Sequence, residues 1–215
     1  MRVIDLATLV LAAIAAVVEL AGPVWANWIT RPLVNLLLLL VAAAGTRGAY
    51  RTLILIGLAS AAIGDLLPLF SGGLFFVSLV VFLTVHLCYI AAFWPGVGLH
   101  GAWIARLVYL TLGVAMVAAL WPVLPPLQRV AIAVYAALIV TMAGQAAGRW
   151  SVLRTAGARS AGLGAGLFLI SDGILALDRW RADFYGAGLV VLLTYYVAQW
   201  LIARSTSDTR PEQPV

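Results

Sequence analysis

Two carboxyl side chains interrupt apolar stretches in this sequence, and they are the residues best suited to chemistry. Asp172 lies within LFLISDGILALDRW (167–180), and Asp65 lies within IGDLLPLF (63–70). Inside a membrane-spanning helix an ionisable side chain costs roughly 2.5–3.5 kcal/mol, and such groups usually face the bundle interior or a wet cavity. We therefore predict that Asp65 and Asp172 are functional, with an interfacial or purely structural role as the alternative for each.

Other polar residues interrupt or border the apolar stretches and are candidates for binding a substrate. Helical spacing places His86 and Tyr89 on one face, and it places Arg179 on the face of Asp172. For Glu19 the alternative is a simple ion pair with Arg31, and for His86 it is a packing role. The full candidate set comprises Glu19, Arg31, Asn35, His86, Tyr89, Ser171, Arg179 and Tyr195, with Gln199 as further polar support.

Several kinds of site are not supported by the sequence. No Cys/His cluster has zinc spacing, no P-loop is present, and GLGAG (162–166) lies within an apolar stretch without a preceding strand. Small residues four positions apart in that segment favour close helix packing instead. We predict neither a metal nor a cofactor. The lone Cys88 is interpreted as a small buried side chain.

Composition identifies the class of protein that must position these residues. The chain has 215 residues, of which 64% are hydrophobic and 10% charged, against about 25% charged in soluble domains. It is therefore predicted to be a polytopic membrane protein. The net charge of +5 does not indicate nucleic-acid binding, because the basic residues are all arginines spread over short loops, where such a bias sets orientation.

Turn signals divide the apolar sequence into about eight predicted transmembrane helices of an all-α bundle. We expect a single domain over residues 1–204, and a polar, flexible cytoplasmic tail over 205–215. Asp5 and Glu19 argue that the first stretch is a retained helix rather than a signal peptide. The predicted helices cover about 3–21, 31–45, 51–67, 72–94, 100–121, 126–147, 158–178 and 184–204.

The arginine distribution predicts that both termini are cytoplasmic, because the loops on their side carry the larger share of arginines. Similar segments in the two halves, IGDLL (63–67) with ISDGI (170–174) and LVVFLT (79–84) with LVVLLT (189–194), suggest a four-plus-four duplication. Chance similarity between Leu- and Val-rich segments is the alternative.

With this topology, four ionisable residues fall at similar depths in the membrane. At 1.5 Å per residue, Glu19, Arg31, Asp65 and Asp172 lie in the outer half of the membrane. The sequence thus predicts one outward-opening pocket in which acids and arginines converge. It does not fix the rotation of any helix about its axis.

Five segments resemble the lysoplasmalogenase (YhhN-like) family of membrane proteins over nearly the whole chain. They are the stretch 63–90, with its glycine–aspartate pair and Phe-rich helix, SAGLGAGLFLISDGILALDRW (160–180), RPLVNLLLLL (31–40), VYAALIVTMAGQA (134–146) and TYYVAQWLI (194–202). Asp65 and Asp172 match the two motif aspartates, whereas Arg31 replaces a lysine. The two cations are not interchangeable at a phosphate.

The resemblance implies an eight-helix hydrolase that cleaves the vinyl ether of a lysophospholipid with a long alkenyl chain. The products would be a fatty aldehyde and a glycerophospho-head group. Two carboxyl groups in different environments can divide acid and base roles, so Asp172 is expected to be the acid and Asp65 the charge-stabilising base; the reverse order stays open. Arg31 and Arg179 would bind the phosphate.

Three other functions remain compatible with the sequence. Intramembrane acids and a repeat also suit a proton-coupled transporter. The substrate could be another lysolipid or ether lipid, or the protein could bind membrane lipids without chemistry. The oligomeric state and the lipid head group are not determined by the sequence.

Overall fold

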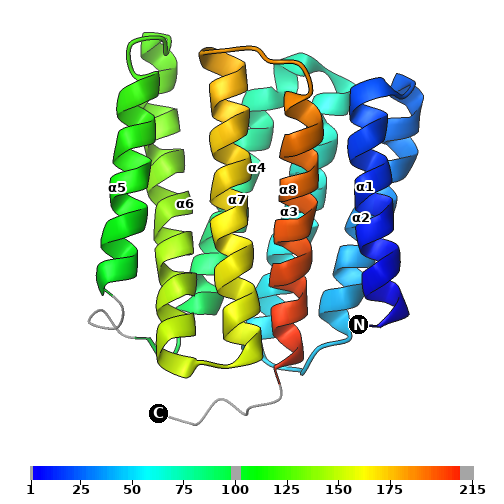
Figure 1. The fold of residues 1–215 in the computed structure, drawn as a ribbon, viewed down its shortest axis with the longest axis vertical. Helices are drawn as coiled ribbons and strands as arrows, with labels where there is room; N and C mark the ends of the chain where they lie inside the picture. Colours follow the sequence, from blue (N-terminus) through cyan, green and yellow to red (C-terminus); the bar gives the residue numbers. More distant parts are fainter. Residues whose placement is uncertain (1, 98–102, 209–215) are drawn as a thin grey trace.

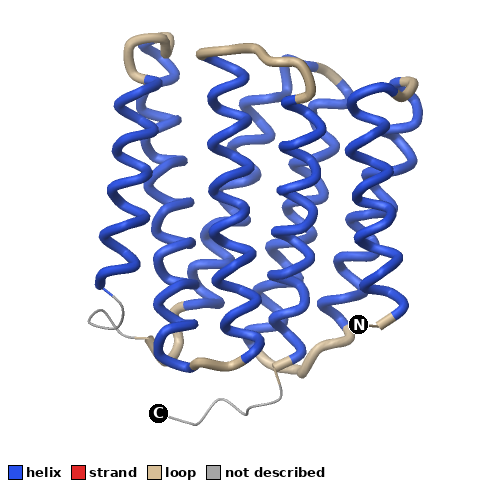
Figure 2. Tube along the Cα trace, in the orientation of Figure 1, coloured by secondary structure: helices blue, strands red, loops and turns tan. Residues whose placement is uncertain are grey.

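A computed structural model describes residues 2–97 and 103–208, and this part of the chain is helical throughout, apart from short connections (Figures 1 and 2). The long helices are α1 (Val3–Ala21), α2 (Val24–Ala43), α3 (Ala49–Phe70), α4 (Phe75–Phe93), α5 (Trp103–Leu120), α6 (Pro126–Leu153), α7 (Ala156–Trp180) and α8 (Ala187–Arg204). Two short 3₁₀ segments, η1 (Gly72–Leu74) and η2 (Ser205–Ser207), adjoin α4 and α8.

All eight of these helices are long and apolar enough to cross a membrane. Large apolar side chains on their outer faces are exposed, as on α5, where Trp103, Leu107 and Val114 are each more than half exposed. Such faces suit contact with lipid hydrocarbon, in which only helices or closed barrels satisfy their own backbone hydrogen bonds. The prediction of an all-α polytopic bundle with eight spans is confirmed.

The helices pack so that distant parts of the sequence meet around the centre of the bundle. α8 packs between α7 and α1 and also contacts α2 and α3, while α6 contacts α4, α5 and α7. In Figure 1, α7, α8 and α1 lie in front of α4, α3 and α2, and α5 forms one edge. α1 begins and α8 ends at the same end of the bundle, as an even number of spans requires.

Two helix boundaries differ substantially from the sequence prediction. α2 begins at Val24 rather than near residue 31, because Pro23 is its N-cap and a proline is readily accepted at a helix start. Arg31 therefore lies in the third turn of α2 rather than at its mouth. α6 continues to Leu153 and ends at Arg154 in the left-handed conformation. The predicted start of the fifth helix, 100–102, lies outside the described residues.

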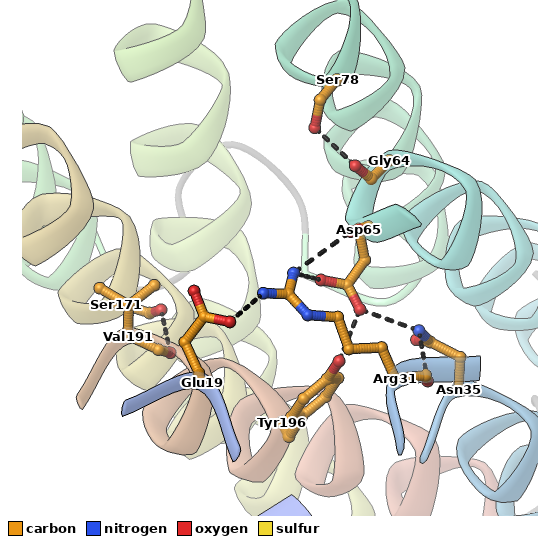
Figure 3. Close-up of polar contacts among 9 residues, drawn as sticks. All are labelled: Glu19, Arg31, Asn35, Gly64, Asp65, Ser78, Ser171, Val191 and Tyr196. Carbon is orange, nitrogen blue, oxygen red and sulfur yellow. Dashed lines mark hydrogen bonds and ion pairs between the residues drawn. The ribbon is translucent and has the colours of Figure 1, made fainter. Parts of the chain in front are cut away.

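A proline in α3 leaves one backbone carbonyl next to Asp65 free to accept a hydrogen bond from α4. Pro68 lies inside α3 and has no backbone N–H, so the carbonyl of Gly64, four residues earlier, loses its helical donor. The Ser78 hydroxyl of α4 donates to that carbonyl at 2.7 Å (Figure 3). Gly64 also permits close packing, since a Cβ there would lie 2.9 Å from the Phe82 ring. The residue before Asp65 is thereby fixed against α4.

The chain after α8 packs back onto the bundle over its first residues. Ser205 and Thr206 are buried, and the Thr206 hydroxyl donates to the Ala42 carbonyl of α2 at 3.1 Å. Of the predicted flexible tail, residues 209–215 lie outside the described residues.

Candidate functional site

Asp65 accepts hydrogen bonds from three side chains. Tyr196 of α8 and Asn35 of α2 both donate to its Oδ2, at 2.5 and 3.0 Å, and Arg31 donates to its Oδ1 at 3.3 Å (Figure 3). The Asp65 side chain is only 6% exposed. The carboxyl group of Asp65 is thus held by three donors, one of them the cationic guanidinium of Arg31.

Arg31 bridges two acids on different helices. Its Nη2 donates to Glu19 Oε2 of α1 at 2.7 Å, while its Nη1 contacts Asp65 on the other side (Figure 3). The Arg31 side chain is 10% exposed, against 31% for that of Glu19. Among the described residues, the buried Nε of Arg31 has no hydrogen-bond partner. The two terminal nitrogens of the guanidinium thus contact different acids, and the contact with Glu19 is more accessible to solvent than the contact with Asp65.

Asp172 has a different environment from that of Asp65. Its Oδ2 accepts a hydrogen bond from the Tyr135 hydroxyl of α6 at 2.6 Å. Within the described residues it has no ion pair. Asp172 therefore has a hydroxyl partner and no cation beside it in the part of the chain that the structure describes, unlike Asp65.

Both aspartates line the same cavity, which has a volume of about 220 Å³. Besides these two aspartates, seven positions with polar or charged side chains line the cavity, and they come from six helices. Four acids and one arginine surround this space, so it is an acidic cavity. The polar lining residues are Glu19, Arg31, Asp65, Ser78, Tyr135, Ser171, Asp172, Asp178 and Tyr195.

The predicted convergence of Glu19, Arg31, Asp65 and Asp172 is therefore found in the structure. Ser171 also lines the cavity, but its hydroxyl donates to the Val191 carbonyl of α8 at 2.9 Å rather than to Asp172 (Figure 3).

Four predicted substrate-binding residues do not line the cavity. The side-chain amide of Asn35 donates a hydrogen bond to Asp65. Tyr89 is fully buried and donates to Gln199 at 2.7 Å. His86 is fully buried, with its ring edge-on to Tyr135 at 4.9 Å between centroids. Arg179 is exposed, with its guanidinium 4.8 Å from the ring of Phe75, which does line the cavity.

Tyr135 and Tyr196 were not among the predicted site residues. A tyrosine hydroxyl inside a membrane helix requires a hydrogen-bond partner, and this requirement is the signal that could have found both. The predicted residue was Tyr195, whose buried hydroxyl forms no well-aligned hydrogen bond within the part of the chain that the structure describes. Successive residues on a helix point in different directions, and the rotation of α8 directs Tyr196 toward Asp65.

Among residues 2–97 and 103–208, no grouping of three or more His, Cys, Asp or Glu side chains could hold a metal ion. Fold and site together define an integral membrane protein of eight helices with two carboxyl groups on one internal cavity. The chain belongs to the YhhN family, whose model matches residues 26–206.

Relatives in bacteria and mammals share this family. The protein named "Uncharacterized membrane protein YhhN" from Escherichia coli O6:H1 is 30% identical over 185 residues, covering 86% of this chain and 88% of the relative. Lysoplasmalogenase TMEM86B of Rattus norvegicus is 33% identical over 190 residues, covering 85% and 74%. Its human counterpart is 32% identical, covering 74% and 65%. No solved structure gives a significant match.

Proposed function

We propose that this protein hydrolyses the vinyl ether bond of a lysoplasmalogen, releasing a fatty aldehyde and a glycerophospho-head group. The observation that carries the proposal is that Asp65 and Asp172 line one cavity in contrasting environments. Named lysoplasmalogenases among the relatives support the substrate class.

The reaction would begin with transfer of the Asp172 proton to the alkenyl carbon next to the ether-bearing carbon. The resulting oxocarbenium ion is stabilised by the Asp65 carboxylate. Water then adds to the cation and gives a proton to Asp65, forming a hemiacetal. In the collapse, Asp65 returns this proton to the leaving ether oxygen and Asp172 accepts the hydroxyl proton. Both carboxyl groups end in their starting states, as paired acids and bases do in glycosidases.

Head-group binding is assigned to the charged side of the cavity. Arg31 would take the phosphate by exchanging its exposed contact with Glu19 for a phosphate oxygen, while its contact with Asp65 persists. Arg179 lies over the ring of Phe75, which lines the cavity, and is the second cation assigned to attract the phosphate.

The test is aldehyde release from a vinyl-ether lysolipid by purified Asp172→Asn and Asp65→Asn proteins. Loss of a general acid or base is expected to reduce kcat by about 10²- to 10⁴-fold. Asp172→Asn is the cleaner variant, because Asp65→Asn also breaks an ion pair. Asp183→Asn, in an exposed connection, serves as the matched control. If both site variants keep near wild-type rates, the carboxylate mechanism is wrong.

A proton-coupled carrier is the competing function, because an acidic cavity within a helix bundle also suits transport. The two functions separate by experiment. Turnover of lysolipid by the detergent-solubilised protein supports the hydrolase, whereas substrate flux across sealed vesicles without turnover supports the carrier. Comparing vinyl-ether, alkyl-ether and ester lysolipids in the same assay tests the substrate class.

A further inference from the structure

A second, smaller cavity of about 70 Å³ adjoins the acidic one, and we call it the annex. The two cavities share a wall that includes both Asp172 and its tyrosine partner. This wall consists of Phe75, Leu79, Tyr135, Asp172 and Leu175. Asp172 therefore lies where the polar space meets the apolar one.

The annex is lined almost entirely by hydrocarbon. Apart from Tyr135 and Asp172, its lining side chains are apolar, and they come from α4, α5, α6 and α7, with Met116, Leu120, Ile132, Ala136 and Gly173 among them. Since about 10–15 Å³ of such space accommodates one water-sized group, the annex has room for roughly five methylene-sized groups. It is also not fully enclosed.

We propose that the annex binds the first carbons of the substrate's alkenyl chain, roughly five beyond the vinyl ether, while the remainder lies in the membrane. This inference rests on the proposed function. If Asp172 protonates the vinyl carbon and Arg31 binds the phosphate, the chain must continue past Asp172. The other walls of the acidic cavity carry Glu19, Asp65 and Asp178, where a hydrocarbon would desolvate charges.

A selectivity rule follows from the size of the annex. The membrane interior is as apolar as the annex, so the chain gains little from transfer alone. The annex therefore selects mainly by exclusion, since a close-packed pocket resists added volume. Substrates should be discriminated by branching near the vinyl ether, and total chain length should matter little.

Photolabelling tests the binding site without requiring turnover. The probes are two ester-linked lysolipids, one with a diazirine at chain carbon four and one with a diazirine at the chain end. After irradiation of the protein in lipid vesicles, the proximal probe should label peptides spanning residues 116–120 or 132–139, and the terminal probe should label them at least tenfold less. Proximal labelling confined to α3 or α8, or equal labelling by both probes, would overturn the proposal.

Two adjacent alanines on α6 provide a matched pair of variants. Ala136 lines the annex, whereas Ala137 is exposed and does not. Ala136→Leu adds three carbon atoms to the annex wall and should reduce proximal labelling, and kcat/KM on the vinyl-ether lysolipid, by at least about tenfold, the lower end of the effect of a single misplaced methylene. Ala137→Leu should leave both unchanged. Equal effects of the two substitutions would contradict the assignment.

A substitution that enlarges the annex tests the proposal even if the Ala136→Leu protein fails to fold. Met116→Ala removes side-chain volume from the annex wall and should raise relative kcat/KM for a chain methyl-branched at carbon four by about tenfold. The control is Leu112→Ala, at an exposed position of the same helix. No change in this ratio would refute exclusion by the annex. Annex labelling without any vinyl-ether turnover would instead reject the proposed function and leave the chain site standing.

Discussion

Replacing Tyr135 by phenylalanine removes one hydroxyl group and keeps the shape of the ring. That hydroxyl donates to Asp172 Oδ2 at 2.6 Å. A hydrogen bond of this kind contributes about 0.5–1.5 kcal/mol net. If it orients the acid in the transition state, its loss lowers kcat by up to about tenfold, since 1.36 kcal/mol corresponds to a factor of ten. KM should change little, because the head group is assigned to the Arg31 side of the cavity.

A double-mutant cycle shows whether Tyr135 acts through Asp172. The four proteins are wild type, Tyr135→Phe, Asp172→Asn and the double variant, assayed for aldehyde release at saturating vinyl-ether lysolipid. Because residues that work as a unit give non-additive effects, Tyr135→Phe should have almost no further effect in the Asp172→Asn background. Tyr109→Phe is the matched control, since Tyr109 lines neither cavity.

Three outcomes would refute this reasoning. The first is an unchanged kcat in Tyr135→Phe. The second is a tenfold loss that persists in the Asp172→Asn background, which would show that Tyr135 acts independently. The third is an equal loss in Tyr109→Phe, which would indicate a general effect of removing hydroxyl groups from the bundle. Thermal unfolding in detergent checks that each variant remains folded.

Further predictions concern binding, packing and orientation. Glu19→Gln removes the carboxylate that competes with the substrate phosphate for Arg31. A partly exposed ion pair of this kind contributes up to about 1 kcal/mol, so KM should fall by up to about fivefold. A rise in KM would mean that Glu19 itself binds the head group. Gly164→Ala should destabilise the protein by about 1–3 kcal/mol in thermal unfolding, because its Cβ would lie 2.8 Å from the Ala198 carbonyl oxygen. Gly72→Ala, with open space around it, should not. For orientation, an impermeant maleimide should label Ala182→Cys in intact cells but Ser207→Cys only after permeabilisation, and the reverse pattern would invert the proposed topology.

Much of the fold follows from the sequence because a bilayer leaves few alternatives. Long apolar stretches must be helical to satisfy their backbone groups, and a fixed rise per residue sets the depth of each polar side chain. These two rules were enough to place Glu19, Arg31, Asp65 and Asp172 at similar depths, and in the structure all four line one cavity. Depth along a helix is a one-dimensional quantity that the sequence contains directly.

Helix ends were harder to predict because several turn signals compete. The segment 21–28 contains proline, glycine and tryptophan, and it was predicted to be a connection. Only its first part breaks the helix, because Pro23 caps α2 and the helix then continues through Pro32. Composition marks the vicinity of a turn, while the hydrogen bonds formed in the folded chain decide its extent.

What the sequence determined by itself was the class of protein, its eight spans and the level at which its acids lie. What the tertiary structure decided was which side chains meet at that level. The rotation of α8 gives Asp65 the hydroxyl of Tyr196 instead of that of Tyr195, and the packing of α6 against α7 gives Asp172 the hydroxyl of Tyr135. The physical reason is that helix rotation is set by contacts between side chains far apart in sequence. The contrast between a carboxylate with three donors and a carboxyl group with one exists only after those contacts form.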